Sequence, residues 1–94
     1  METRFSSSTG TKVDVGSSST AVLSANPDRK YLALVNDSDE VIYIKLAGTA
    51  VLNEGIRLNA SGGSLVMEIA NAIYLGAISA ICTSGSKNLT VTEG

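Results

Sequence analysis

The stretch Asn26–Gly48, NPDRKYLALVNDSDEVIYIKLAG, decides the fold of this chain. Two apolar runs, Tyr31–Val35 and Val41–Leu46, flank the polar break Asn36–Glu40. The second run is rich in β-branched and aromatic residues, which fit a pleated, half-buried surface. Asn, Asp and Ser supply turn chemistry in the break, so the sequence predicts a β-hairpin over this stretch.

The two predicted strands differ in the pattern of their faces. Tyr31–Val35 is apolar at odd and even positions, which predicts a central strand covered on both sides. In Val41–Leu46 the even positions are all apolar, whereas the odd positions include Tyr43 and Lys45. We therefore expect the even face to lie in the core and the odd face to need solvent or a partner.

Short strand-like segments follow one another along the rest of the chain. Turn signals separate them at intervals of about eight to twelve residues, and no amphipathic helical segment interrupts them. About seven to nine strands in this spacing predict an all-β fold, a small antiparallel β-sandwich or jelly-roll-like barrel. The other predicted strands are 11–15, 20–23, 56–58, 64–69 and 89–92. The run 72–82 is predicted to form either two short strands or one strand bent at Gly76 by a bulge.

The length of 94 residues suits one domain. Residues 1–10 are mostly polar and predict a flexible N-terminal arm, in which Phe5 is a candidate anchor against a neighbouring subunit. Residues 11–94 then form a single β-sandwich domain. Because so short a chain has a modest core, we expect association with copies of itself or with a partner to add stability.

Composition argues against several classes of function. The net charge is −2, and the lysines and arginines are scattered, whereas nucleic-acid binding needs a concentrated basic face. No stretch approaches the roughly 20 apolar residues of a membrane helix, and no apolar signal region follows Met1. The single cysteine, Cys82, lies in an apolar run and is expected to be a small buried hydrophobe.

The sequence offers few residues that could carry out catalysis or bind a metal ion. Histidine is absent, so no Ser/His/Asp or Cys/His set can form. Glu54 and Glu68 are the candidates for an acid–base pair, but the alternation around Glu68 turns it to solvent. Asp37 and Asp39 could hold a hard cation, but the EF-hand pattern is missing and a solvated turn is favoured. We predict no catalytic, cofactor-binding or metal-binding residues, and no enzyme.

Arg29 and Lys30 follow Asp28 at the mouth of the first strand of the central stretch. Charges in such a place are usually a solvated rim, which is the favoured reading here. The alternative is an ion pair between subunits.

Several runs of the chain resemble small virion proteins of tailed bacteriophages. The resemblance is one of overall pattern and covers most of residues 26–94. It implies a β-sandwich or jelly-roll module without catalytic residues, of the kind that decorates or cements the capsid. The runs that carry it are Asn26–Ser38, Ile42–Leu46, Asn53–Ile56, Gly62–Gly63 and Leu89–Gly94.

The resemblance implies a homo-oligomer, with a trimer favoured, bound to the major capsid protein or another virion protein. The chain would be made in the host cytoplasm and reside on the capsid surface. The open alternatives are another virion component, such as a head-fibre base, neck or tail protein, or a carbohydrate- or ligand-binding sandwich. The candidate interface residues are Phe5, Arg29, Lys30, Tyr31, Tyr43 and Lys45.

Overall fold

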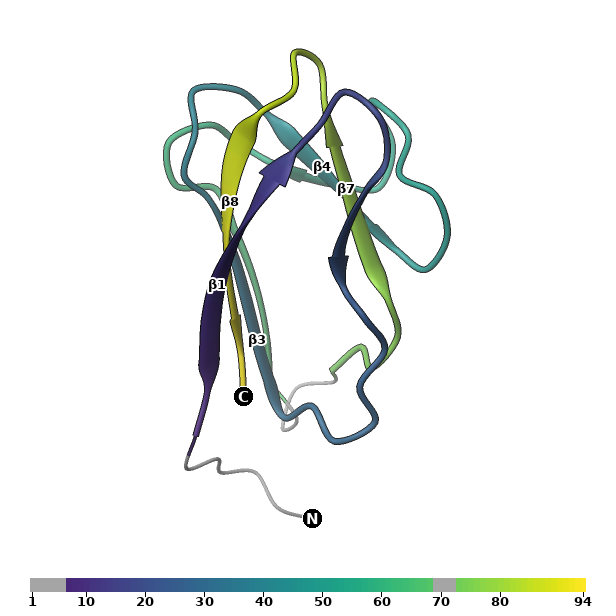
Figure 1. Ribbon diagram of the computed structural model, residues 1–94, viewed down its shortest axis with the longest axis vertical. Helices are drawn as coiled ribbons and strands as arrows, with labels where there is room; N and C mark the ends of the chain where they lie inside the picture. Colours follow the sequence, from purple (N-terminus) through teal and green to yellow (C-terminus); the bar gives the residue numbers. More distant parts are fainter. Residues whose placement is uncertain (1–6, 69–72) are drawn as a thin grey trace.

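The computed structural model describes residues 7–68 and 73–94. Within these ranges there is no helix, and eight strands form two antiparallel sheets of four (Figure 1). The predicted all-β sandwich is therefore confirmed. The strands are β1 (Thr9–Val15), β2 (Thr20–Leu23), β3 (Tyr31–Asn36), β4 (Ile42–Leu46), β5 (Ile56–Leu58), β6 (Ser64–Glu68), β7 (Ile78–Cys82) and β8 (Lys87–Glu93).

The strands pair in a nested order. Sheet A has the order β1-β8-β3-β6, and sheet B has the order β2-β7-β4-β5. The first strand thus pairs with the last, the second with the seventh, the third with the sixth and the fourth with the fifth. This is one long antiparallel ribbon rolled into two sheets, the jelly-roll arrangement of eight strands.

The predicted hairpin over Asn26–Gly48 is wrong. β3 belongs to sheet A and β4 to sheet B, so the break Asn36–Glu40 is an arch between sheets. Both edges of β3 are occupied by β8 and β6, and both edges of β4 by β7 and β5. The loops at 62–63 and 84–86 are arches for the same reason, and among the eight described strands only β4 and β5 are consecutive and paired.

The core lies between the two sheets. Leu32 and Leu34 of β3 and Ile42 and Ile44 of β4 are fully buried, which confirms the even face of the second predicted strand as a core face. Cys82 is buried in the same cluster, as expected. The other members of the cluster are Val15, Leu58, Ile78, Ala80, Leu89 and Val91.

Two segments differ in extent from the sequence prediction. Within the apolar run 72–82, the described residues before Ile78 form no strand, and Ala72 lies outside the described residues. β1 begins at Thr9, so Thr9 and Gly10 belong to the sandwich, whereas the arm was expected to run to residue 10. The rest of that arm up to Ser6, including Phe5, lies outside the described residues.

Asn36 closes one end of the sandwich. Its side chain is fully buried at the end of β3. Its Nδ2 donates to the carbonyl oxygens of Glu40 at 2.7 Å and Leu58 at 3.0 Å, and its Oδ1 accepts from Ser38 Oγ at 2.6 Å. One amide therefore supports the β3–β4 arch and fastens sheet A to β5 of sheet B.

The β5–β6 arch lies against the β3–β4 arch. The Ser61 N–H donates to the Ser38 carbonyl oxygen and the Gly62 N–H to the Asn36 carbonyl oxygen, both at 2.8 Å. Gly63 lies so close to Asn59 that a Cβ at this position would overlap the Asn59 backbone. Gly63 therefore allows a close backbone approach between chain segments.

We expect Asn36→Ala to lower the free energy of unfolding by about 1–3 kcal/mol, because the Leu58 carbonyl group loses a buried donor and the Glu40 carbonyl group keeps only the Ser38 hydroxyl as a side-chain donor. Urea denaturation of the purified protein measures this. Asn59→Ala is the matched control, since Asn59 is exposed and its amide accepts only from Arg57 Nε. An Asn36 variant as stable as the control would contradict this role.

Candidate functional site

Arg29 is buried at the opposite end of β3 from Asn36. The residue is 1% exposed, and its Nε lies 2.7 Å from Glu93 Oε2 of β8. Its Nη1 donates to the carbonyl oxygens of Tyr74 at 2.7 Å and Gly76 at 3.2 Å, and its Nη2 donates to that of Ser24 at 2.9 Å. The guanidinium group thus joins three separate parts of the chain.

The loop before β3 presents this side chain through a compact turn. The Asp28 N–H donates to Asn26 Oδ1 at 3.0 Å, and the Arg29 N–H donates to the Asn26 carbonyl oxygen at 3.2 Å. An Asx turn is therefore present beside Pro27. Asn26 Nδ2 also donates to Glu93 Oε2 at 3.3 Å, so the turn and the ion pair share one carboxylate.

The favoured reading of Arg29 as part of a solvated rim is wrong. Nε, Nη1 and Nη2 of its guanidinium group all have partners inside the molecule, and the group does not reach the surface. No local sequence pattern connects Arg29 with Glu93, because only the fold brings the end of β8 beside the start of β3.

The other candidate interface residues do not lie on one surface. Tyr31 is on the outer side of β3 in sheet A, and Lys30 precedes it, with its N–H donating to the Gly94 carbonyl oxygen at 2.8 Å. Tyr43 and Lys45 are on the outer side of β4 in sheet B. Because β3 and β4 are in different sheets, these residues point away from the sandwich in opposite directions.

The outer side of sheet B is partly covered by the chain itself, although Ala21 and Arg57 on that side are exposed. Residues 47–55 connect β4 to β5, yet the Ala50 N–H donates to Ser19 Oγ at 2.9 Å, beside β2 at the other edge of the sheet. The loop must therefore cross β7, whose outward residue Ile81 is only 8% exposed. The Tyr43 hydroxyl donates to Asn53 Oδ1 of the same loop at 3.0 Å.

The outer side of sheet A carries a patch of uncharged residues, which we call the A face. Its members come from three neighbouring strands, β8, β3 and β6 (β8 and β3 are labelled in Figure 1). Val66 is 51% exposed, the most exposed of the large apolar side chains in the described residues. The A face consists of Ala33, Val35, Val66, Thr90 and Thr92.

The sequence pattern already contained the signal for the A face. In β6, Leu65 and Met67 pack against the core, so Val66 between them must point outward. The expectation that Glu68 faces solvent is confirmed by its exposure. What the sequence lacked was the order of the strands, which places Val66 and Thr92 on either side of Ala33.

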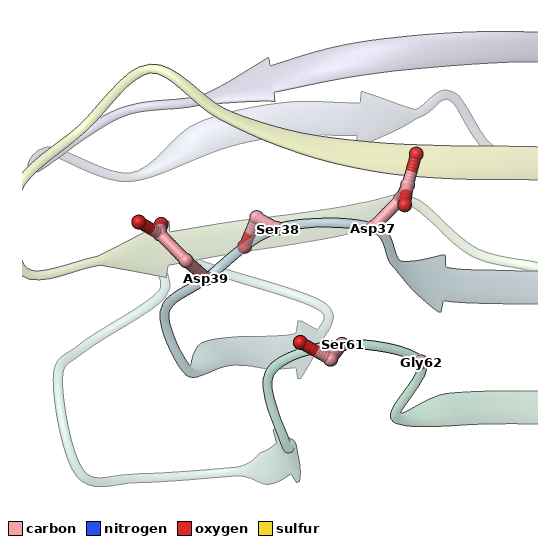
Figure 2. Close-up of a pocket in the computed structure, with 5 residues that line it drawn as sticks. All are labelled: Asp37, Ser38, Asp39, Ser61 and Gly62. Carbon is pink, nitrogen blue, oxygen red and sulfur yellow. The ribbon is translucent and has the colours of Figure 1, made fainter.

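An open depression of about 430 Å³ lies where the two arches meet, lined by Asp37, Ser38, Asp39, Ser61 and Gly62 (Figure 2). The carboxylates of Asp37 and Asp39 point in different directions in this view. Asp37 Oδ2 accepts from Asn88 Nδ2 at 3.3 Å, and Asp39 Oδ1 lies 2.8 Å from Lys87 Nζ. In residues 7–68 and 73–94 no three His, Cys, Asp or Glu side chains are grouped to hold a metal ion.

Hydrogen bonds to side chains of the β3–β4 arch lower the pKa of two carboxyl groups. The hydrogen bond from Lys87 and its positive charge lower the pKa of Asp39 below its ordinary value. The backbone N–H and the hydroxyl of Ser84 each donate to Glu40 at 2.7 Å, and these bonds lower the pKa of Glu40. Glu40 therefore holds the β7–β8 loop against the β3–β4 arch, and Asp39 holds the first residue of β8 there.

The residues considered for catalysis are not brought together. Glu54 is in the loop that covers sheet B, whereas Glu68 is on the exposed side of β6 in sheet A. The Cys82 thiol is buried and donates to the Val15 carbonyl oxygen at 3.3 Å, and burial raises its pKa. A thiol in that state is a poor nucleophile.

Comparison of the chain with protein-family models, curated proteins and solved structures finds no match. The resemblance to phage virion proteins therefore stays a prediction. In the described part of the chain, no helix has the length and apolar character needed to cross a membrane.

We expect Arg29→Met to lower the free energy of unfolding by about 2–4 kcal/mol, because Glu93 and three carbonyl groups lose their donor. Arg29→Lys should recover only part of this, since one ammonium group cannot reach all of these acceptors. Urea denaturation measures both, with Lys30→Met as the control that removes a neighbouring charge. Equal stability of the Arg29 and Lys30 variants would refute the assignment.

We expect acid to loosen the contact between the β3–β4 arch and the β7–β8 loop, which Glu40 makes with Ser84. Because the folded pKa of Glu40 lies below that of an unfolded glutamate, its stabilisation is present at neutral pH and is lost as the pH falls below about 4. Glu40→Gln should therefore reduce the loss of stability between about pH 7 and pH 3. The urea midpoint measures this, and Glu54→Gln should behave like the wild type. If Glu40→Gln and Glu54→Gln both lose as much stability in acid as the wild type, the contact of Glu40 with Ser84 does not have this role.

Proposed function

We propose that this chain is a non-enzymatic structural protein of a bacteriophage particle. It binds the outer surface of the capsid as a homo-oligomer and stabilises the head. Two lines of argument support the proposal: the resemblance in residues 26–94 and the nature of the A face. The major capsid protein is the proposed partner, and the capsid surface is the proposed location.

The A face is the observation that carries the proposal. A surface of Val, Ala and Thr side chains suits contact with another protein, because none of these side chains carries a charge that binding would have to strip of water. The exposed charged residues Lys12 and Glu68 lie at its borders, opposite Thr90 and two residues from Val66. The outer side of sheet B is instead partly covered by residues 47–55. Sheet A is the more open of the two at its centre, since Val66 is 51% exposed and Ile81 of sheet B only 8%. The jelly roll is also a fold that occurs in viral capsid domains.

The described residues favour binding over chemistry. They bring together no histidine, no reactive thiol and no pair of carboxylates in a closed cavity. The depression at the arches is open, and its two carboxylates are engaged by β8 and the residues beside it. Catalysis by general acids and bases needs such groups within reach of one another.

Two alternatives remain proposals of lower rank. A role as a head-fibre base, neck or tail protein would use the same A face on a different virion partner. A carbohydrate-binding sandwich would need aromatic rings that are open to solvent, but Tyr43 is tied to Asn53 and Tyr74 packs against the core.

We expect the purified protein to co-sediment with undecorated heads of the phage that encodes it. Val66→Arg should weaken this binding at least tenfold, because the A face would have to bury an unpaired charge on contact. Val51→Arg is the matched control: Val51 is 45% exposed, close to the 51% of Val66, but lies in the loop that covers sheet B.

The two variants separate the possible answers. Loss of binding by the Val66 variant alone supports the A face as the contact surface. If both variants weaken binding equally, or if neither weakens it, the A face is not the contact surface. If the wild type fails to bind heads at several salt concentrations, the decoration function is refuted.

A further inference from the structure

We propose that β1 is a self-recognition edge, at which two copies of this chain pair their β1 strands antiparallel around a two-fold axis at Val13. Sheet A then becomes one continuous sheet of eight strands across the dimer. The inference deepens the homo-oligomer of the proposed function and replaces the expected trimer with a dimer.

The backbone shows which groups β1 offers to a partner. Gly94 and Tyr31 exchange N–H to carbonyl bonds of 2.9 and 3.3 Å, and the Asp37 N–H donates to the Asn88 carbonyl oxygen at 3.1 Å. Even-numbered residues along β8 thus turn their backbone groups to β3, and odd-numbered residues turn theirs to β1, because these groups alternate between the two edges.

The same alternation fixes the free edge of β1. Odd-numbered residues of β8 lie opposite odd-numbered residues of β1, as Leu89 lies opposite Val13. The even-numbered residues Gly10, Lys12 and Asp14 therefore turn their N–H and C=O groups to the open edge of sheet A. A second β1 must bring its own even-numbered residues opposite these.

Only a few registers satisfy that condition, and charge selects one of them. A two-fold axis at Val13 places Lys12 opposite Asp14 of the second copy, and Asp14 opposite its Lys12. Shifting the axis to Lys12 or to Asp14 places like charges opposite each other, which is destabilising. An axis at Thr11 satisfies the backbone but pairs neither charge. The Val13 register therefore forms two favourable charge pairs.

The two charged side chains are available for this pairing. Lys12 and Asp14 are exposed on the same side of β1, and neither has a hydrogen bond or ion pair within the described residues. A lysine on an edge strand usually hinders pairing with other chains. Because Asp14 lies two residues away, Lys12 can pair with the Asp14 of an identical strand, but only in the Val13 register.

The other sheet edges are less suited to a second copy. β2 has four residues and a register shift between Ala21 and Leu23, and β5 has three residues. β6 has five described residues, and its self-pairing around Val66 would place Ser64 opposite Glu68 without any opposite charge. β1, with seven residues, is the longest edge strand described.

Pairing in this register has a consequence for capsid binding. Residues opposite each other in an antiparallel sheet point to the same side, so both A faces of the dimer face the same way. Two A faces on one sheet can contact two neighbouring subunits of the capsid at once, which gives the dimer an avidity that a single A face lacks.

The test is the mass of the wild-type protein in solution as a function of concentration, by analytical ultracentrifugation. A single strand pairing is a small interface, so we expect a reversible monomer–dimer equilibrium. Lys12→Asp and Asp14→Lys should each raise the dissociation constant about tenfold or more, because both symmetric charge pairs become repulsive. Lys45→Asp, on the outer side of sheet B, is the control and should dimerise like the wild type.

Charge exchange tests the register. The double variant Lys12→Asp/Asp14→Lys should dimerise like the wild type, since the pairs are restored with their signs exchanged. An equimolar mixture of the two single variants should form a heterodimer, because one chain then carries two carboxylates and the other two ammonium groups at the edge. Failure of both restorations would refute the Val13 register.

Amide hydrogen exchange gives a readout that does not depend on variants. The amides of Lys12 and Asp14 should become protected as concentration rises, whereas that of Val13 is already bonded to β8. A monomer at every concentration, or a trimer, would overturn the proposal. A dimer that does not bind phage heads would refute the decoration function and leave this inference standing.

Discussion

The buried guanidinium group of Arg29 is the interaction on which the arrangement of the chain depends. It is taken out of water and is offset by a carboxylate and three carbonyl groups from separate parts of the sequence. Removing a charge from water is costly unless it is paired and hydrogen-bonded. The start of β3, the segment before β7 and the end of β8 must therefore all be in place before this group is stable.

The two ends of β3 are closed by different chemistry. Arg29 holds one end by charge, and Asn36 holds the other with a neutral amide that bonds both sheets. Between them Leu32 and Leu34 contribute only apolar burial. Apolar packing does not distinguish one register from another as sharply as hydrogen bonds do, so the polar ends fix the position of β3 in the sandwich.

The sequence predicted elements better than connections. Alternation located most strands and the core face of Ile42 and Ile44, because the period of two is a local property. It could not show that β3 and β4 belong to different sheets, since turn-forming residues such as those around Asn36 serve hairpins and arches alike. For the same reason Tyr31 and Tyr43 were expected on one surface but lie on opposite sides. The A face required the strand order, which joins residues far apart in the chain.

The nested pairing also sets the order in which the fold can be completed. Ile44 and Ile56 pair across a single loop, whereas Thr9 and Glu93 come from nearly opposite ends of the chain. Each outer pair closes a shorter effective loop once the pair inside it has formed, which lowers the entropic cost of closure. We infer that pairing spreads from β4–β5 and that β1 joins last. The strand that would recognise a second copy is then presented only by a chain whose other strands are already in place, so association follows folding instead of competing with it.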